Sequence, residues 1–477
     1  MHPFAERLSA RDRLFLDLEA ANAPQHVAML CWLEAKPLRD AAGALDLARI
    51  RARIGSRLPL VPRTRQRLAH IPIDQHPVWV DDEHFDLALH VLHTALPKPG
   101  DAHALKQLVA RLLAEPLDRG RPLWEVWLID GLSRGRCALL AKVHHCMADG
   151  VAGFAWFAEL LAGDADEPIA AQAPWTPRPA PDRDELLRRE VGRRAEQWLD
   201  ALHKLPGLLE RREEIEDFAA RMSRRASALG ETLSAALAPA PEVPFNGPLG
   251  PLRAFEWRSL SMERVSALRK ALGGTLNELA LACVAGALRE LMIREGAEIE
   301  DVVLRASVPV NRRGDGDAHS GGNRISLCVV ELPVGEADAR ARHARVCQSS
   351  ARAKSSEQVR GLELLADLAD WTTSALMGAA ARAALQSRPF NLVVTNIPGP
   401  TRPLQVLGAK LQALAPALNL AEGLGLGVAL ASYAGQLTFG CIADPHRVPD
   451  LAAFADGLVA SFEELEKAAP AAASPES

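Results

Sequence analysis

The sequence lacks the features that mark several large classes of protein. Aromatic residues make up only 5% of its 477 residues, with a single tyrosine, so few rings are available to stack on nucleic-acid bases. The formal net charge is -5, so the chain is no polycation, and this argues against nucleic acid as its main partner. We therefore expect no nucleic acid among its partners.

Paired cysteine motifs and nucleotide-binding loops are also missing. The seven cysteines are widely spaced and include no CxxC pair, a pattern typical of reduced cytosolic thiols rather than of disulfides or a zinc site. There is no GxGxxG or GxxxxGK[ST] loop. The sequence therefore predicts no metal and no cofactor.

Long apolar runs are absent as well. The N-terminus has no apolar core of a signal peptide, and the most lipid-like stretch, 411–439, is interrupted by Pro416, Asn419 and Glu422. The expected location is the cytoplasm, with peripheral attachment to the inner face of the plasma membrane or to lipid inclusions as a further hypothesis.

What the sequence does contain is typical of a globular protein of several units, with 48% hydrophobic and 24% charged residues. Both main units mix strand and helix patterns, which indicates an α/β protein of mixed sheets. We expect a first unit at 1–165, a Pro-rich and helical linker at 166–245, a second unit at 246–465 and a disordered tail at 466–477. Ser9, with Asp12 three residues later, predicts the start of the first helix.

The segment from Lys142 to Gly150 carries the chemistry. It reads Lys-Val-His-His-Cys-Met-Ala-Asp-Gly and includes the end of an apolar strand predicted over 136–145. Because side chains alternate along a strand, His144 and His145 should point to opposite faces and cannot easily share one metal ion. One of them should face a cavity and the other the core or a hydrogen-bond partner.

Imidazole titrates near neutral pH and can take a proton from a hydroxyl that attacks an activated carbonyl. We assign this general-base role to His145 and a supporting role to His144. Asp149 can hold the following loop or steer an imidazole, and Gly150 permits the turn. The competing interpretation is a pair of core histidines before a routine turn. Cys146 is disfavoured as a nucleophile, since no feature lowers its pKa and it would face away from His145.

The HHxxxDG motif alone indicates only a superfamily of proteins. Several further stretches of the sequence narrow the resemblance to one family within it. They are Leu8-Ser9-Ala10-Arg11-Asp12, Pro24-Gln25-His26-Val27, Pro116-Leu117-Asp118-Arg119, Arg121-Pro122-Leu123-Trp124-Glu125, Asn246-Gly247-Pro248-Leu249-Gly250, Gly322-Asn323-Arg324-Ile325-Ser326, Thr395-Asn396-Ile397-Pro398-Gly399-Pro400, Ser432-Tyr433-Ala434-Gly435-Gln436-Leu437-Thr438-Phe439-Gly440 and Asp444. From residue 8 to about 450, the chain resembles the bacterial wax ester synthase/acyl-CoA:diacylglycerol acyltransferase family, a branch of the chloramphenicol-acetyltransferase-like and condensation-domain superfamily.

The resemblance implies two similar domains with an active-site tunnel between them. It also implies transfer of a fatty acyl group from acyl-CoA to diacylglycerol or a long-chain alcohol in a ternary complex, giving triacylglycerol or wax ester. His145 would deprotonate the hydroxyl, with no acyl-enzyme. Asp149 would be structural and paired with an arginine. Asn323-Arg324 could supply that partner or bind CoA phosphates, or be an ordinary polar pair at a strand edge.

Other site residues follow from their local context. Asn277 begins an apolar helix and is a candidate oxyanion donor or site support, with a plain helix N-cap as the alternative. The family usually has Asp where this chain has Glu278, which questions any role for that carboxylate. Trp124 either packs the domain or lines the tunnel. Asn396, Pro398 and Gly399 read as a strand-ending turn that could shape the substrate channel.

Two alternatives keep the fold and change the function. One is a condensation-type acyltransferase that uses carrier-protein thioesters, although no carrier domain is fused here. The other is a catalytically silent lipid-binding homologue, against which the intact His145 and Asp149 argue. The linker helix could lie on a membrane or lipid-droplet surface, but its balanced acids and bases favour a solvated helix.

Overall fold

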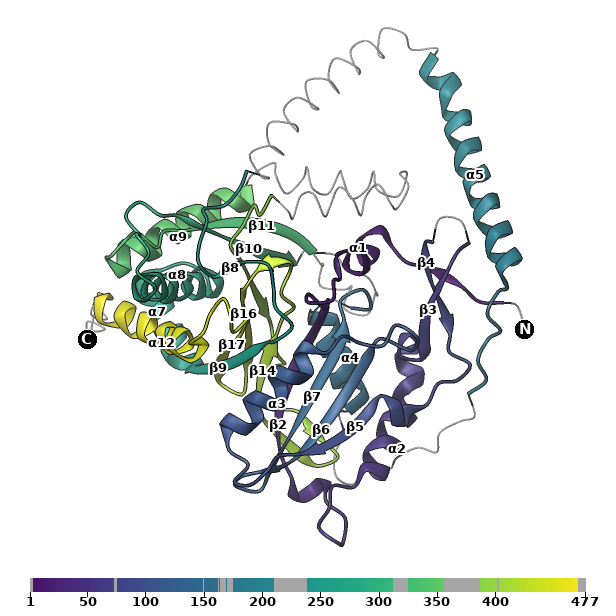
Figure 1. The fold of residues 1–477 in the computed structure, drawn as a ribbon, viewed down its shortest axis with the longest axis horizontal. Helices are drawn as coiled ribbons and strands as arrows, with labels where there is room; N and C mark the ends of the chain where they lie inside the picture. The colour runs from purple at the N-terminus through teal and green to yellow at the C-terminus, as the bar shows by residue number, and fades with distance from the viewer. Residues whose placement is uncertain are drawn as a thin grey trace, which may run out of the picture.

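In the computed structural model, two six-stranded sheets dominate the chain (Figure 1). The structure describes residues 3–72, 75–148, 150–161, 163, 169, 175–209, 238–311, 325–355, 387–400 and 403–470. Most strand pairs are antiparallel, and β5–β6, β10–β12 and β12–β16 are parallel. The expected fold class, mixed α/β with two units, is confirmed.

The first sheet has the order β13-β14-β2-β7-β6-β5. Its strands are β13 (Gln405–Val406), β14 (Ala409–Ala417), β2 (His26–Glu34), β7 (Arg136–His144), β6 (Trp124–Leu132) and β5 (Val91–Ala95). β14 comes from the second half of the chain and pairs antiparallel with β2. The two halves are therefore joined by a shared sheet.

The second sheet has the order β11-β10-β12-β16-β17-β9. Its strands are β11 (Ile325–Leu332), β10 (Leu304–Asn311), β12 (Leu392–Ile397), β16 (Leu426–Tyr433), β17 (Gln436–Ala443) and β9 (Ala254–Ser261). Two small sheets are formed by β1 (Glu6–Arg7), β4 (Pro77–Asp81) and β3 (Gln66–His70), and by β15 (Gly423–Leu424) and β8 (Asn246–Gly247).

The described helices lie around these sheets. They are α1 (Ala10–Leu18), α2 (Leu47–Arg57), α3 (Ala102–Ala114), α4 (Gly150–Leu161), α5 (Arg183–Leu209), α7 (Met262–Leu272), α8 (Leu276–Arg294), α9 (Ala339–Ser355) and α12 (Leu451–Ala468), with 3-10 turns η1 (Lys36–Leu38), η2 (Leu58–Leu60), η3 (Pro62–Arg65) and η4 (Leu87–Leu89). Figure 1 shows α7, α8, α9 and α12 together on the outer side of the second sheet, and α5 extending away from the body.

Sequence signals set several of these ends. Ser9 caps α1 by accepting the Asp12 N–H at 3.1 Å, as predicted. α12 runs to Ala468, so the first residues of the expected tail are helical, and residues 471–477 lie outside the described part.

Three large buried clusters make up most of the core in the part of the chain that the structure describes. One lies between the second sheet and helices α8 and α12, and a second lies on the α4 side of the first sheet. The third joins the units: Leu30 and Leu140 of the first sheet share it with Ala429 and Ile442 of the second. Burial of apolar area across this junction, at about 25 cal/mol per Å², stabilises the arrangement of the two units.

No single helix in the described part of the chain is long and apolar enough to cross a membrane. α7 and α8 reach that length and composition only as a pair bent by 95°. α8 packs in the core of the second unit.

Candidate active site

The end of β7 positions the histidine pair. β7 pairs with β2 along its whole length and ends at His144. His145 follows, and its backbone N–H donates to the carbonyl oxygen of Gln25 at 2.8 Å. Because side chains alternate along a strand, His145 continues the face that carries Ala141 and Val143. The histidine pair thus divides at the strand end, with one ring on each face.

The imidazole of His145 is half-buried and lies against the ring of Phe15. The ring centroids are 3.8 Å apart and the planes are 9° from parallel. A stacked neighbour covers the face of an imidazole and leaves its edge, which carries both nitrogens, for hydrogen bonding in the ring plane. Phe15 was not predicted as a site residue; it is brought in by α1 from 130 positions earlier in the chain.

His144 is enclosed, with 1% of its surface exposed. Its Nδ1 accepts the backbone N–H of Cys146 at 3.1 Å, and its Nε2 lies 3.4 Å from Oε1 of Glu19. Burial raises the pKa of the Glu19 carboxyl, but hydrogen bonding to His144, Gln25 and Arg119 prevails and lowers it to about 2. His144 therefore sits against a buried, ionised carboxylate. The sequence offered no periodic signal for Glu19, which follows α1 as its C-cap.

The rest of the motif leads into α4. Gly150 is the first residue of this helix, and Asp149 lies outside the described residues. Cys146 is buried, and burial raises the pKa of its thiol well above the usual value. A thiol in that state is a poor nucleophile, in agreement with the expectation from the sequence.

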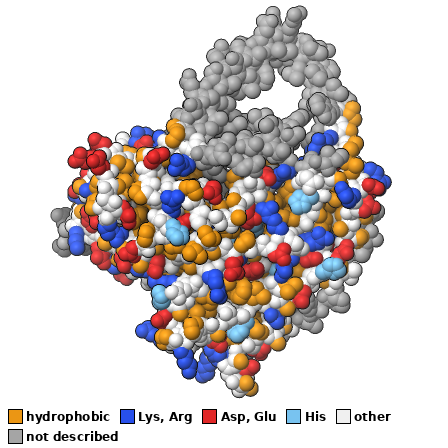
Figure 2. Space-filling model, viewed as in Figure 1, with side chains coloured by type: hydrophobic (Ala, Val, Ile, Leu, Met, Phe, Trp, Pro, Cys, Tyr) orange, Lys and Arg blue, Asp and Glu red, His pale blue; other side chains and the backbone are white. Residues whose placement is uncertain are grey.

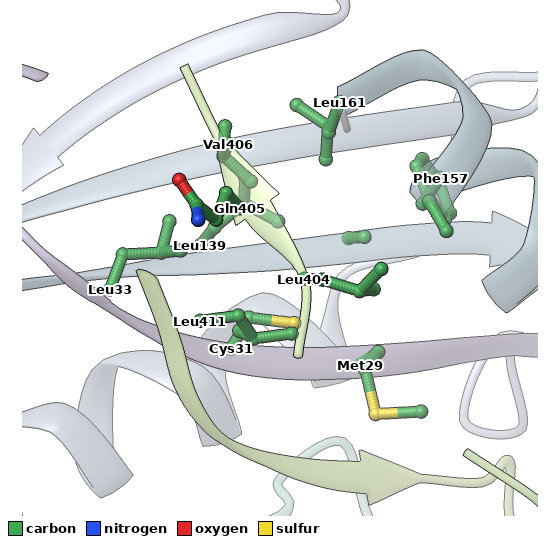
Figure 3. Close-up of a pocket in the computed structure, with 12 residues that line it drawn as sticks. Met29, Cys31, Leu33, Leu139, Phe157, Leu161, Leu404, Gln405, Val406 and Leu411 are labelled. Carbon is green, nitrogen blue, oxygen red and sulfur yellow. The ribbon is translucent and has the colours of Figure 1, made fainter. Parts of the chain in front are cut away.

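A small apolar pocket lies on the same side of the first sheet as His145 (Figure 3). It is lined by Met29, Cys31, Leu33, Leu139, Ala141, Phe157, Ala158, Leu161, Leu404, Gln405, Val406 and Leu411. Figure 3 shows Phe157 and Leu161 reaching in from α4 toward the side chains on β2 and β13. Its apolar walls suit part of an alkyl chain or another lipid group.

The only tyrosine of the chain holds one wall of this pocket. The hydroxyl of Tyr433 accepts the backbone N–H of Leu404 at 2.8 Å and donates to the carbonyl oxygen of Leu411 at 3.0 Å. Both partners line the pocket, and Tyr433 ends β16 of the second sheet. The second unit therefore helps to shape a pocket of the first.

Comparison with known proteins decides the family. Residues 8–280 match the wax ester synthase/diacylglycerol acyltransferase catalytic domain, and residues 321–466 match the C-terminal domain of the same family. The chain belongs to this family. A probable diacylglycerol O-acyltransferase of Mycobacterium tuberculosis is 34% identical over 414 residues, which cover 85% of each chain.

Solved structures agree. The wax ester synthase/diacylglycerol acyltransferase from Marinobacter aquaeolei VT8 superposes with a TM-score of 0.67 at 27% identity, covering 97% of this chain and 99% of that one. The starter condensation domain of rhizomide synthetase, solved with C8-CoA, has a TM-score of 0.58 at 14% identity and covers 98% of this chain and 96% of its own. The second likeness shows the shared fold alone.

Asn277 is not the cap of its helix. Thr275 caps α8 and forms a reciprocal capping box with Glu278, so the N-cap alternative for Asn277 is wrong. Asn277 Oδ1 accepts the side-chain N–H of Asn396 at 2.7 Å. This bond leaves the NH₂ group of Asn277 as a donor. Ile397, next to Asn396, belongs to the same buried cluster as the neighbours of His145.

Glu278 stands where the family usually has Asp, and both oxygens of its carboxylate are bonded to other parts of the protein. Its Oε2 accepts the Thr275 N–H at 2.8 Å and its Oε1 accepts from Nζ of Lys354 at 2.9 Å. Burial raises the pKa of this carboxyl, but the bonds from Lys354, Thr275 and Ser350 prevail and lower it to about 2. The longer acid therefore secures the start of α8 beside Asn277.

Trp124 packs inside the first unit. It is 1% exposed, its indole N–H donates to the carbonyl oxygen of Thr64 at 2.8 Å, and its ring stacks on His90. Its edge meets Phe157, a wall residue of the pocket, with ring centroids 6.4 Å apart. Trp124 thus stands behind the pocket wall and is not among the residues that line it.

The predicted turn after β12 lies at the surface. Pro398 is exposed, and Gly399 is half-buried. A Cβ built on Gly399 would stand 1.8 Å from the carbonyl oxygen of Ser432, so only glycine permits this approach of the two chains. Asn323 and Arg324 lie outside the described residues.

Proposed function

We propose that this chain transfers a fatty acyl group from acyl-CoA to the hydroxyl of diacylglycerol, of a long-chain alcohol, or of both. The products would be triacylglycerol and wax ester. One observation carries the proposal: His145 continues the strand face on which Ala141 and Leu139 line the apolar pocket. A general base and a place for an alkyl chain thus share one side of the sheet. The family membership and the names of its relatives support the same substrates.

In this mechanism His145 takes the proton of the acceptor hydroxyl as its oxygen attacks the thioester carbonyl. The tetrahedral intermediate then collapses, the carbon–sulfur bond breaks, and CoA leaves as the thiol with that proton. General-base catalysis of this kind is worth about 10²–10⁴ in rate. Family membership implies that both substrates bind together without an acyl-enzyme, and the buried thiol of Cys146, a poor nucleophile, agrees with this.

The intermediate carries an oxyanion that needs a donor, and we assign this role to the NH₂ group of Asn277, which Asn396 holds through its oxygen. Its position in the first turn of α8 adds the favourable field of a helix N-terminus. Asp149 is proposed as a structural residue that fixes the loop after His145, paired with an arginine, and Gly150 provides the turn.

The substrates would meet in a tunnel between a first domain, 1–165, and a second, 246–465, joined by the linker 166–245. Acyl-CoA would enter one mouth and the acceptor the other. The turn at Asn396, Pro398 and Gly399 would shape the channel wall. Trp124 would act indirectly, by supporting the pocket-wall residue Phe157.

Association with a membrane or lipid-droplet surface is a separate part of the proposal. Val191 and Leu199 on α5 expose 59% and 53% of their surface, which gives this helix apolar contacts for lipid. Figure 2 shows acidic and basic side chains interspersed over the visible face, so attraction to anionic lipid would be weak. Flotation with liposomes tests it: a folded variant lacking 183–237 should float less, and undiminished flotation would exclude the linker.

Purified protein given labelled palmitoyl-CoA with hexadecanol or dioleoylglycerol tests the activity. We expect labelled ester with at least one acceptor, and at least a hundredfold loss of kcat in His145→Ala with an unchanged circular dichroism spectrum. Retention of more than a tenth of the activity would exclude His145 as the base. Ester formed only from carrier-protein thioesters would instead indicate a condensation-type acyltransferase. Bound lipid with no ester would indicate a catalytically silent lipid-binding protein.

A further inference from the structure

A buried carboxylate lies directly behind the histidine pair. Glu19 has 9% of its side chain exposed. Its Oε1 accepts the backbone N–H of Gln25 at 3.1 Å and faces Nε2 of His144 at 3.4 Å. Its Oε2 accepts two N–H groups of Arg119, at 2.9 and 2.5 Å. Both carboxylate oxygens are therefore engaged, one toward the motif and one toward a compensating charge.

These contacts select one tautomer of His144. Nδ1 accepts the Cys146 N–H, so this nitrogen carries no proton. The single proton of the neutral ring is then on Nε2, which faces the Glu19 carboxylate. Lowering of the pKa of Glu19 to about 2 keeps that carboxylate ionised across the working range of most enzymes. The ring is thus held at Nδ1 by a backbone donor, and its Nε2 faces a charged carboxylate at 3.4 Å.

The same carboxylate is also linked to the backbone of His145 itself, through Gln25. The backbone N–H of His145 donates to the carbonyl oxygen of Gln25, whose own N–H donates to Glu19. The side-chain oxygen of Gln25 also accepts from Nδ2 of Asn419 at 2.6 Å, which ties this segment to the second half of the chain. Residues before and after His145 are therefore anchored, directly or through one intermediate, on Glu19.

We propose that Glu19 is a positioning residue for the acyl transfer: through His144 and Gln25 it fixes the backbone on both sides of His145 and so aims its imidazole. Arg119 neutralises the carboxylate and holds it in place. This inference rests on the proposed function, in which His145 is the base. Misplacement of a reacting group by about 1 Å can cost roughly a hundredfold in rate, without a comparable loss of substrate binding.

Kinetics of Glu19 variants test the proposal. In Glu19→Ala, kcat should fall about 10- to 100-fold, with KM for palmitoyl-CoA and for the acceptor within about threefold of wild type. Glu19→Gln keeps an oxygen for Gln25 and His144, so it should retain clearly more activity than Glu19→Ala. This rescue by the closer isostere is not expected of a residue that contributes stability alone.

Glu190 provides a matched control. It is also buried, bonded to Arg193 and Arg194, and has a pKa lowered to about 2, but it lies on α5. Glu190→Ala and Glu190→Gln should keep kcat within about twofold of wild type at a temperature where all variants are folded. A kcat of Glu19→Ala within threefold of that of Glu190→Ala, or a loss seen mainly in KM, would overturn the proposal.

A spectroscopic test separates this proposal from the proposed function. In protein labelled with ¹⁵N-histidine, the ring signals of His144, assigned by their absence in His144→Gln, should report a proton on Nε2 and none on Nδ1. Glu19→Gln should keep this pattern and Glu19→Ala should give mixed tautomers. The readout needs no turnover, so it stands even if no acceptor is esterified. A proton on Nδ1 in the wild type would overturn the inference.

Discussion

The rings of Phe15 and His145 lie face to face, with centroids 3.8 Å apart and planes 9° from parallel. Phe15 is on α1, the helix that ends just before Glu19. α1 therefore supports both histidines of the motif, one through a ring contact and one through a carboxylate. A short helix far from the motif in sequence thus determines how the motif is held.

Replacement of Phe15 by leucine should lower kcat about tenfold, because the imidazole of His145 loses the flat surface that restricts its rotation. KM should change little, and esterification of hexadecanol or dioleoylglycerol at saturating palmitoyl-CoA measures both. Phe85→Leu is the control, since Phe85 stacks on His90 with centroids 5.2 Å apart. Equal effects of the two substitutions would show that the Phe15 contact has no specific role.

The location of the motif could be predicted from the sequence, because its pattern is local. An apolar run followed by polar residues predicts a buried strand and its end, and β7 ends within one residue of the expected position at 145. Alternation along that strand also predicts that His144 and His145 have different surroundings. They do: one faces Glu19 and the other stacks on Phe15.

The partners of the motif could not be predicted, because they depend on the fold. Glu19 and Phe15 are more than 120 positions from the histidines, and no spacing rule connects them. In the same way, the apolar alternation of β14 indicates a strand but not its neighbour. Its pairing with β2, across the two halves of the chain, is decided by the packing of both units.

Filling the apolar pocket should change acyl-chain preference. Ala158 on α4 lines the pocket, and Ala158→Leu would occupy space that a long chain needs. We expect the ratio of kcat/KM for palmitoyl-CoA to that for decanoyl-CoA to fall at least about tenfold, since even one methylene in an apolar pocket is worth about 1–3 kcal/mol. Ala155→Leu adds the same side chain on an exposed position of α4 and should leave the ratio unchanged. If both variants behave alike, the pocket does not hold the acyl chain.

Trp124 should contribute to stability rather than to substrate choice. Trp124→Phe removes the N–H that bonds the buried carbonyl of Thr64, so the free energy of unfolding in urea should fall by about 1–3 kcal/mol. The chain-length ratio should stay within about twofold of wild type, because the ring stands behind Phe157. Unchanged stability together with an altered ratio would instead indicate that Trp124 contacts substrate.

The lowered pKa of the Glu278 carboxyl should make the stability of the protein depend on pH. This carboxyl has a pKa of about 2 in the folded protein against 4.5 in the unfolded chain, so its contribution is present above 4.5 and is lost as the pH falls toward 2. At pH 7, Glu278→Gln should lower the free energy of unfolding by roughly 1–3 kcal/mol, since Lys354 is half exposed and solvent screens that ion pair. The difference from wild type should shrink below about pH 5.

Urea titrations at several pH values measure this difference. Glu290→Gln, at an exposed position of the same helix, is the control and should differ little from wild type at any pH. A gap between Glu278→Gln and wild type that stays constant from pH 7 to pH 3 would contradict the lowered pKa.

Asn277 and Asn396 should act as one unit in the reaction. Asn396 donates to Asn277 Oδ1, and this bond sets the direction in which the NH₂ group of Asn277 can donate. If that group stabilises the oxyanion, Asn277→Ala should lower kcat about 10²–10³-fold. Asn396→Ala should lower kcat less, because the donor remains but is no longer held.

The double variant distinguishes coupling from two separate effects. Once Asn277 is alanine, the side chain of Asn396 has no donor to orient, so the double variant should have the kcat of Asn277→Ala alone. Loss of activity equal to the product of the two single losses would mean that Asn396 acts independently, for instance on the substrate. A kcat for Asn277→Ala within threefold of wild type would remove Asn277 from the chemistry and leave it as the residue that secures β12 against the start of α8.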